Sequence, residues 1–166
     1  MVSMFRSNHP EQTISPRFIE CPTGHSFAFL TDHENQSGIS VELKRHTHGV
    51  NLLIEDCQYR EEDYQKNKTG WGHASDTYVA RLAQEAEVEA LGLTHHDPAS
   101  TDQDVDGIVD AVRGHLQEAG MYIPVFGCFD GLTIDVGGVA GSVALAREQL
   151  RQELIKQLEY LIARNQ

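Results

Sequence analysis

The chain has 166 residues, of which 40% are hydrophobic and 23% are charged, as is usual for one globular domain with its own core. Its formal net charge of −12 argues against a general binding surface for nucleic acid or anionic membrane, but it does not exclude a local basic pocket. The chain has three cysteines without a CxxC spacing, no apolar signal core at its start and no long apolar run, so we expect a cytoplasmic protein without membrane spans.

The first third of the chain predicts a β-hairpin. Residues 1–16 are polar and contain two prolines, so we expect them to be irregular. Residues 17–20 and 25–31 alternate in hydrophobicity on either side of a Cys-Pro-Thr-Gly turn, which is typical of two antiparallel strands. Asp32 comes directly after the second of these strands, and a short helical turn is expected around residues 41–43.

The central stretch, residues 51–98, predicts a strand, a loop, a helix, a second strand and a second loop. The apolar runs 52–54 and 90–93 have the length of short buried strands. A helix is expected over residues 77–86, where apolar residues recur at helical spacing after the capping residue Ser75. Polar side chains therefore gather at the carboxyl ends of two strands, which is where an α/β sheet places a site.

The last third predicts two helices with a pair of strands between them. A helix over residues 103–119 is followed by strands at 121–126 and 132–136, and two glycines then form a hinge before a helix over 139–164. The last helix carries an apolar stripe formed by Val143, Leu150, Leu154, Ile155, Leu158, Leu161 and Ile162.

Three motifs of the central stretch appear in the order and spacing of a known family. They are LLIEDCQY at residues 52–59, GWGHAS at 70–75 and LTHHDP at 93–98. Together with SFAFLTDHE at 26–34, they resemble the C-terminal half of metallo-β-lactamase-fold hydrolases, in the branch related to ribonuclease Z and phosphodiesterase-like enzymes. The resemblance covers roughly residues 5–137.

The resemblance implies an α/β fold that is half of an αββα sandwich. We expect a mixed sheet with helices on one face, followed by a long C-terminal helix. Residues 1–138 would form the half-domain and residues 139–166 the amphipathic helix. The strands are too apolar on both faces to leave one face in water, so we expect a homo-oligomer or a separate chain to cover the open face. The alternative is a monomer in which the helix over 139–164 folds back onto that face.

The resemblance also implies a two-metal site that uses zinc or manganese. Carried over residue by residue, His9 and His95 each hold one ion and Asp32 bridges the two. His73 matches a catalytic histidine that contacts the substrate phosphate. We expect Asp56 to lie near the ligands rather than among them. Taken singly, His9 could also be a surface residue, Asp32 a turn residue and His73 a helix cap.

The family's first ligand motif, HxHxDH, does not occur in this sequence. The only HxH triplet is His46-Thr47-His48, which we interpret as part of a loop. We therefore expect the isolated chain to bind metal weakly or not at all, and to need a partner chain that supplies the remaining ligands.

Three functions remain open at this point. The first is a metal-dependent hydrolase of phosphodiester or ester bonds, for which nucleic acid is expected only as a substrate. The alternative is a noncatalytic interaction protein derived from a truncated hydrolase. The third, an acidic decoy for a nucleic-acid-binding protein, rests on net charge alone.

Overall fold

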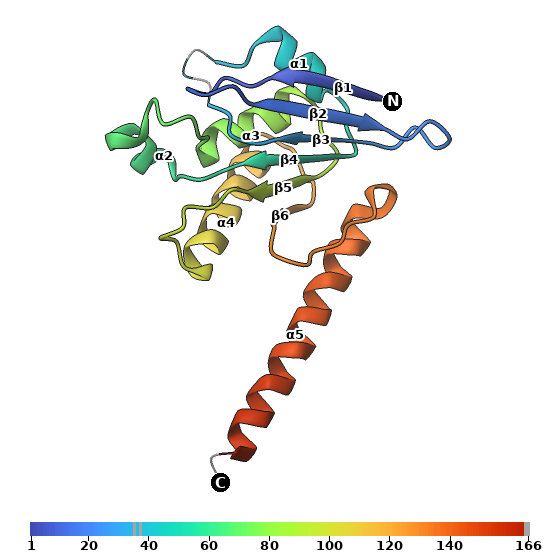
Figure 1. The fold of residues 1–166 in the computed structure, drawn as a ribbon, viewed down its shortest axis with the longest axis vertical. Helices are drawn as coiled ribbons and strands as arrows, with labels where there is room; N and C mark the ends of the chain where they lie inside the picture. The colour runs from blue at the N-terminus through green and yellow to red at the C-terminus, as the bar shows by residue number, and fades with distance from the viewer. Residues whose placement is uncertain (35, 37, 165–166) are drawn as a thin grey trace.

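The computed structural model describes residues 1–34, 36 and 38–164. Its centre is a six-stranded sheet in which the strands follow one another in sequence order (Figure 1). The sheet is mixed, because the first three strands are antiparallel and the last four are parallel to one another. The strands are β1 (Val2–Arg6), β2 (Ile14–Ile19), β3 (Ser26–Leu30), β4 (Leu52–Asp56), β5 (Leu91–Thr94) and β6 (Val125–Gly127). The predicted mixed α/β sheet is confirmed.

Helices cover one face of the sheet (Figure 1). The three that pack there are α1 (Val41–Thr47), α3 (Asp76–Glu85) and α4 (Asp102–Glu118). Their apolar sides meet the strands in one large core that includes Leu43, Leu53, Val79, Leu82 and Val112. The remaining helical elements are α2 (Glu61–Asp63), the π-helical turn η1 (Tyr64–Lys68), the 3₁₀ turn η2 (Val136–Gly138) and α5 (Val139–Arg164).

The helix starts follow from side chains that accept the free N–H groups of the first turn. Ser75 Oγ accepts from the backbone N–H of Tyr78 and begins α3. Thr101 and Asp104 form a capping box at the start of α4. These two caps explain why the helices begin within a residue of their predicted starts.

The other face of the sheet is apolar and only partly covered. Side chains of Phe27, Leu52, Ile54 and Phe126 form a smaller cluster there with residues of the segment 128–143. Phe18 stacks on Phe27 at the margin of this cluster, with 4.8 Å between the ring centroids, and remains partly exposed. Strands β3 and β4 are therefore apolar on both sides, as the sequence predicted.

Helix α5 extends away from the sheet (Figure 1). Val139 and Val143, at its start, contact the smaller apolar cluster. The predicted stripe further along α5 is exposed in this chain, from Leu150 to Ile162. The division into residues 1–138 and 139–166 stays a prediction. None of the helices in the described part of the chain is both long and apolar enough to cross a membrane.

Several predictions of local structure were wrong. Residues 1–16 are not irregular, because β1 and the start of β2 pair with each other there. Pro16 is tolerated because it lies outside Arg17–Ile19, the part of β2 that pairs with β3. A strand was predicted over residues 121–126, but only its last two residues belong to a strand, because β6 begins at Val125.

The predicted strand 132–136 is absent from the described sheet. Leu132, Ile134 and Val136 alternate because they pack onto the open apolar face, where they lie against the strands without pairing with them. Asp135 caps the following 3₁₀ turn by accepting from the N–H of Gly137 at 2.9 Å. Alternation of apolar and polar residues therefore indicates contact with an apolar surface. It occurs in a segment that lies across a sheet as well as in a strand that pairs within it.

Glu55 is a buried carboxyl group in the main core. It lies on β4 between Leu30 of β3 and Leu93 of β5, and its side chain is 0% exposed. Neither carboxyl oxygen has a hydrogen-bond partner among the described residues. Burial raises the pKa of Glu55 well above its usual value of 4.5, and the nearby Asp56 raises it further. The group is therefore protonated in the folded chain at pH values where the unfolded chain has lost the proton.

The substitution Glu55→Gln should stabilise the chain at neutral pH and have little effect in acid. The folded pKa lies above the unfolded one, so Glu55 costs no ionisation energy below about pH 4.5 and destabilises increasingly above it. Gln keeps the shape and cannot ionise. Urea unfolding midpoints measured from pH 4 to pH 8 should diverge in favour of the variant, whereas Glu62→Gln, at an exposed site, should follow the parent. Parallel profiles for Glu55→Gln and the parent would contradict this account.

Candidate metal centre

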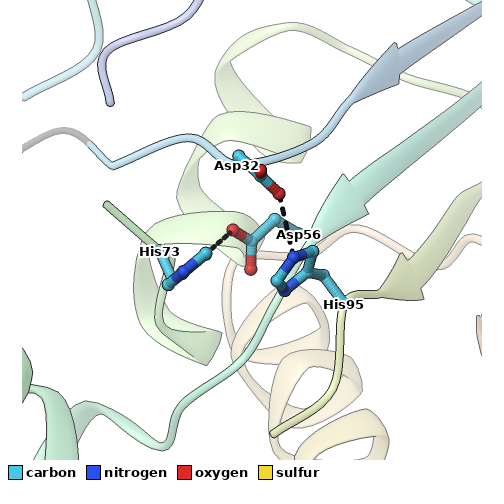
Figure 2. Close-up of side chains that lie close together, drawn as sticks. All are labelled: Asp32, Asp56, His73 and His95. Carbon is cyan, nitrogen blue, oxygen red and sulfur yellow. Dashed lines mark hydrogen bonds and ion pairs between the residues drawn. The ribbon is translucent and has the colours of Figure 1, made fainter. Parts of the chain in front are cut away.

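Two carboxylates and two imidazoles meet at one edge of the sheet (Figure 2). Asp32 follows β3, Asp56 is the last residue of β4 and His95 follows β5. These three strands are parallel neighbours, so their carboxyl ends lie side by side. His73 comes from the loop before α3. One potential ligand atom from each of the four residues lies within 4.8 Å of the others. We call these four residues the cluster.

The cluster is organised as two imidazole–carboxylate pairs. His73 Nδ1 lies 2.7 Å from Asp56 Oδ2, and His95 Nε2 lies 2.9 Å from Asp32 Oδ1 (Figure 2). The two rings stack with centroids 4.6 Å apart and planes 24° apart. The contact between His73 and Asp56 is a hydrogen bond from the ring N–H to the carboxylate, which fixes the tautomer of the His73 ring.

The backbone at two of the four positions is unusual. Asp32 and His95 both have positive φ, 48° and 57°. Residues other than glycine rarely adopt this left-handed conformation, and those that do are concentrated at functional sites. Gln58 supports His95 from the other side, because its amide nitrogen lies 3.1 Å from His95 Nδ1 and 3.3 Å from its carbonyl oxygen. The chain thus holds both residues in the geometry that aims them at each other.

Asp56 is the most buried member of the cluster. Its side chain is fully buried, and Oδ1 has no hydrogen-bond partner among the residues described. Burial raises the pKa of Asp56, while the hydrogen bond from His73 opposes that rise. The same bond raises the pKa of the His73 imidazole above 6.5. The two side chains are therefore held together inside the protein, and one oxygen of Asp56 is still free to accept a cation.

The donor atoms of the cluster suit zinc or manganese. Both ions take imidazole nitrogen together with carboxylate oxygen. The free oxygen of Asp56 and the short spacing of the four side chains fit such an ion. Part of this set was predicted from sequence, namely Asp32, His73 and His95, and the structure brings these three together.

Asp56 was expected beside the ligands and lies among the potential ligands instead. The sequence carried a signal for it, because Asp56 ends a buried strand at the sheet edge where the site was predicted. Asp56 was interpreted as a loop or supporting carboxylate because the predicted strand ended at residue 55. In the structure β4 continues to Asp56, and its last residue carries the side chain into the cluster.

His9 lies next to the cluster without being one of its four residues. Its ring centroid is 5.6 Å from that of His73, and its Nδ1 accepts from the backbone N–H of Glu11. A Cβ atom at Gly72 would come within 2.1 Å of the His9 ring, so only glycine allows this approach. A metal-binding role for His9 stays a prediction.

The HxH triplet takes no part in the cluster. His46 and Thr47 are the last residues of α1, so the loop interpretation was wrong there. His46 stacks on Phe5, and Thr47 is buried, with its hydroxyl donating to the carbonyl of Leu43. The ring of His48 forms a hydrogen bond with the backbone carbonyl of Ala86. These contacts are structural.

A buried carboxylate, Glu34, joins the loops around the cluster. Its two oxygens accept the backbone N–H groups of Gly70 and Gly72, both at 2.8 Å, and one of them also accepts the hydroxyl of Tyr64. Its own N–H donates to the carbonyl of Asn8 at 2.8 Å. These hydrogen bonds lower the pKa of Glu34 despite its burial, so the carboxylate is charged. Sequence reasoning did not identify this residue.

His33 completes the support beneath Glu34. It is buried, and burial lowers its pKa to about 4, so the ring is neutral at neutral pH. Its Nδ1 accepts from the backbone N–H of Asn8 at 3.1 Å, which leaves the proton on Nε2, 2.9 Å from the Tyr78 hydroxyl. The segment that carries His9 is thus fastened to the loop that carries Asp32.

No protein-family model matches the chain. Two curated relatives are bacterial ribonuclease Z proteins. The one from Treponema denticola is 29% identical over 104 residues, which cover 61% of this chain and 32% of the relative. The one from Brevibacillus brevis is 29% identical over 126 residues, which cover 76% of this chain and 35% of the relative. The chain thus spans about a third of the length of these relatives.

Solved structures show the same fold. The metallo-β-lactamase-fold protein YhfI of Bacillus subtilis aligns with a TM-score of 0.60 and 18% identity, over 78% of this chain and 47% of that protein. The short form of human tRNase Z aligns with a TM-score of 0.57 and 18% identity, over 81% of this chain and 42% of that protein. The chain therefore has a part of the metallo-β-lactamase fold.

Proposed function

We propose that this chain forms part of a metal-dependent hydrolase that cleaves phosphodiester or ester bonds. The observation that carries the proposal is the cluster itself, in which a buried carboxylate with one free oxygen meets a second carboxylate and two imidazoles. The curated relatives named ribonuclease Z support hydrolysis as the reaction class.

In this proposal Asp32, Asp56 and His95 hold zinc or manganese, with His9 as a further ligand from the neighbouring loop. A bound ion would activate water and neutralise charge that develops on the substrate. His73 acts on the substrate instead. Its Nδ1–H is held by Asp56 and its raised pKa favours the protonated ring, so Nε2 can donate to a non-bridging oxygen or to the leaving group.

We further propose that ligands from another chain complete the site. The sequence contains no HxHxDH motif, and the open sheet face offers an apolar surface on which a second sheet would pack. A second copy of this chain is the other candidate for that surface. The noncatalytic alternative, an interaction protein, is favoured by the exposed apolar side chains of α5.

Substitution of His73 by Ala should separate the two roles in the cluster. Turnover of a phosphodiester should fall on the order of 10²-fold or more, as for loss of a general acid, while metal content per chain stays nearly unchanged. Asp56→Asn should instead lower metal content and turnover together, since it removes the buried charge. Turnover and plasma emission analysis of the same samples give both readouts.

An equal loss of metal and rate in His73→Ala would place His73 among the ligands. Less than about 0.1 ion per chain in the parent, with no gain when a candidate partner chain is added, would contradict the hydrolase proposal and favour the noncatalytic one.

Substitution of Glu34 by Gln should loosen the loop that carries His73. The amide places a donor opposite the N–H of Gly70 or Gly72, so one hydrogen bond is lost and the free energy of unfolding should fall by about 1–3 kcal/mol. Amide exchange at Gly70 and Gly72 should accelerate, while exchange at Leu53 in the central strand stays slow. Glu118→Gln, at an exposed position on α4, is the matched control. Unchanged exchange at both glycines would show that the carboxylate does not hold this loop.

The uncovered apolar surfaces should make the chain associate. We expect light scattering to show a dimer or larger assembly for the full chain, because the open sheet face and the α5 side chains both expose apolar area to water. A chain ending at Gly138 tests the sheet face alone. The full-length double variant Leu154→Lys, Leu158→Lys tests α5 without removing Val139 from the core. Folded monomers in all three samples would show that neither surface needs a partner.

A further inference from the structure

The first strand of the sheet is an edge strand whose outer main-chain groups are free. In the described sheet β1 pairs with β2 and with no other strand (Figure 1). Met1 and Ile19 are hydrogen-bonded to each other at one end of this pair. Bonded and unbonded residue pairs alternate along an antiparallel ladder. The N–H and C=O groups that face away from β2 therefore belong to Val2, Met4 and Arg6.

This edge lacks the usual protection against an added strand. Natural sheets protect an edge with proline, with a charge in the middle of the strand or with a covering element. β1 contains no proline and its one charged residue is its last, while Val2 and Met4 are 52% and 63% exposed. An extended segment of another molecule can therefore pair with β1 through its main chain.

Three arginines lie beside this edge. Arg6, Arg17 and Arg45 line one hollow of about 710 Å³, next to β1, β2 and α1. None of the three forms an ion pair with a carboxylate in the described part of the chain. Glu42 is the one carboxylate in the lining, and burial lowers the pKa of His46, so that ring adds no charge. The hollow thus carries surplus positive charge in a chain whose net charge is −12.

The wall of the hollow also has hydrogen-bonding capacity that the chain does not use. Arg17 Nη1 donates to the backbone carbonyl of His46 at 3.0 Å, so the main chain of α1 holds this guanidinium group in place. Arg17 Nε and His46 Nε2 are buried and have no hydrogen-bond partner among the residues described. Buried polar atoms are normally paired, so polar atoms of another molecule can gain partners here.

The charge of the hollow selects among the molecules that could occupy the edge. A second copy of this chain, paired through its own β1, would bring two sets of unpaired arginines together, and like charges repel. Nucleic acid would suit the arginines but offers no strand to the main chain of β1, and the net charge of the chain repels it. An extended peptide with acidic side chains meets both requirements.

We propose that β1 and the three arginines form a docking site for an extended acidic segment of a partner protein. The segment adds a strand to β1 through main-chain hydrogen bonds, and its carboxylates bind Arg6, Arg17 and Arg45. This site goes beyond the proposed hydrolase, because none of the four cluster residues lines the hollow. Docking and hydrolysis can therefore be tested separately.

A blocked peptide of alternating glutamate and valine, long enough to span β1, tests the site. We expect saturable binding in calorimetry and slower amide exchange at Met4, while exchange at Phe5, whose N–H faces β2, stays unchanged. The double variant Arg6→Gln, Arg45→Gln should weaken binding on the order of ten-fold and flatten its salt dependence. Arg151→Gln, at an exposed position on α5, is the matched control and should change neither.

Two further samples separate main-chain pairing from charge alone. The same peptide with an N-methyl group at every residue keeps its carboxylates and has no N–H donors, so it should bind on the order of ten-fold more weakly. Met4→Pro removes an outward N–H from β1 and is tolerated on an edge strand, so it should weaken binding while circular dichroism shows an intact fold.

Binding of the N-methylated peptide, or of an alternating lysine–valine peptide, as tight as that of the parent peptide would overturn the docking site. Unchanged affinity in the double arginine variant would do so as well. An oligothymidylate that binds more tightly than the peptide would assign the arginines to nucleic acid instead. Protection of the Met4 N–H without peptide, rising with chain concentration, would assign the edge to a second copy.

Discussion

The parallel alignment of β3, β4 and β5 is the constraint on which the candidate site depends. Parallel strands in register must end at the same edge of the sheet, so the residues that follow them converge whatever their spacing in sequence. Asp32 and Asp56 are 24 residues apart in the sequence, and Asp56 and His95 are 39 residues apart, but the three side chains still meet. His73 is the exception, because a loop delivers it. That loop is held in place by the Glu34 carboxylate, which accepts two hydrogen bonds from backbone N–H groups of the loop.

Two adjacent buried carboxyl groups on β4 illustrate how environment decides protonation. Glu55 points into the apolar core, finds no partner among the described residues and keeps its proton, since burial raises its pKa. Asp56 points to the sheet edge, where His73 donates a hydrogen bond and opposes the rise of its pKa. The alternation of a strand thus places one carboxyl group in the apolar core and the next one at the candidate site. The sequence shows both residues but not which of them faces the site.

Features that depend on local pattern were predictable, and features that depend on distant contacts were not. The helices α3 and α4 have caps and apolar spacing that can be read within a dozen residues, so their positions were predicted closely. Strand β1 has no such pattern, because it is an edge strand whose pairing with β2 is fixed by main-chain bonds. The alternation of residues 132–136 was misread because packing across a sheet and pairing within it produce the same period.

The same division applies to the candidate site. Asp32, His73 and His95 were predicted because each lies within a short contiguous motif that resembles a motif of a known family. Glu34 was missed because its role exists only through hydrogen bonds to glycine N–H groups 36 and 38 residues away. The types of side chain along a sequence do not show which of them will accept a hydrogen bond from a distant backbone N–H. Asp56 was undervalued because the end of a short strand is difficult to place, and one residue more in β4 changes a loop carboxylate into a potential ligand.

The two imidazole–carboxylate pairs also define what an ion would have to displace. His95 Nε2 lies 2.9 Å from Asp32 Oδ1, so an ion that used both of these atoms would have to separate them. The bond between His73 and Asp56 imposes no such demand, because it uses Nδ1 and Oδ2 and leaves Asp56 Oδ1 without a partner. The cluster therefore offers an oxygen without a partner at Asp56, whereas Asp32 and His95 contact each other. Under the proposed function, Asp56 Oδ1 is thus the oxygen that could accept a cation without breaking a contact within the cluster.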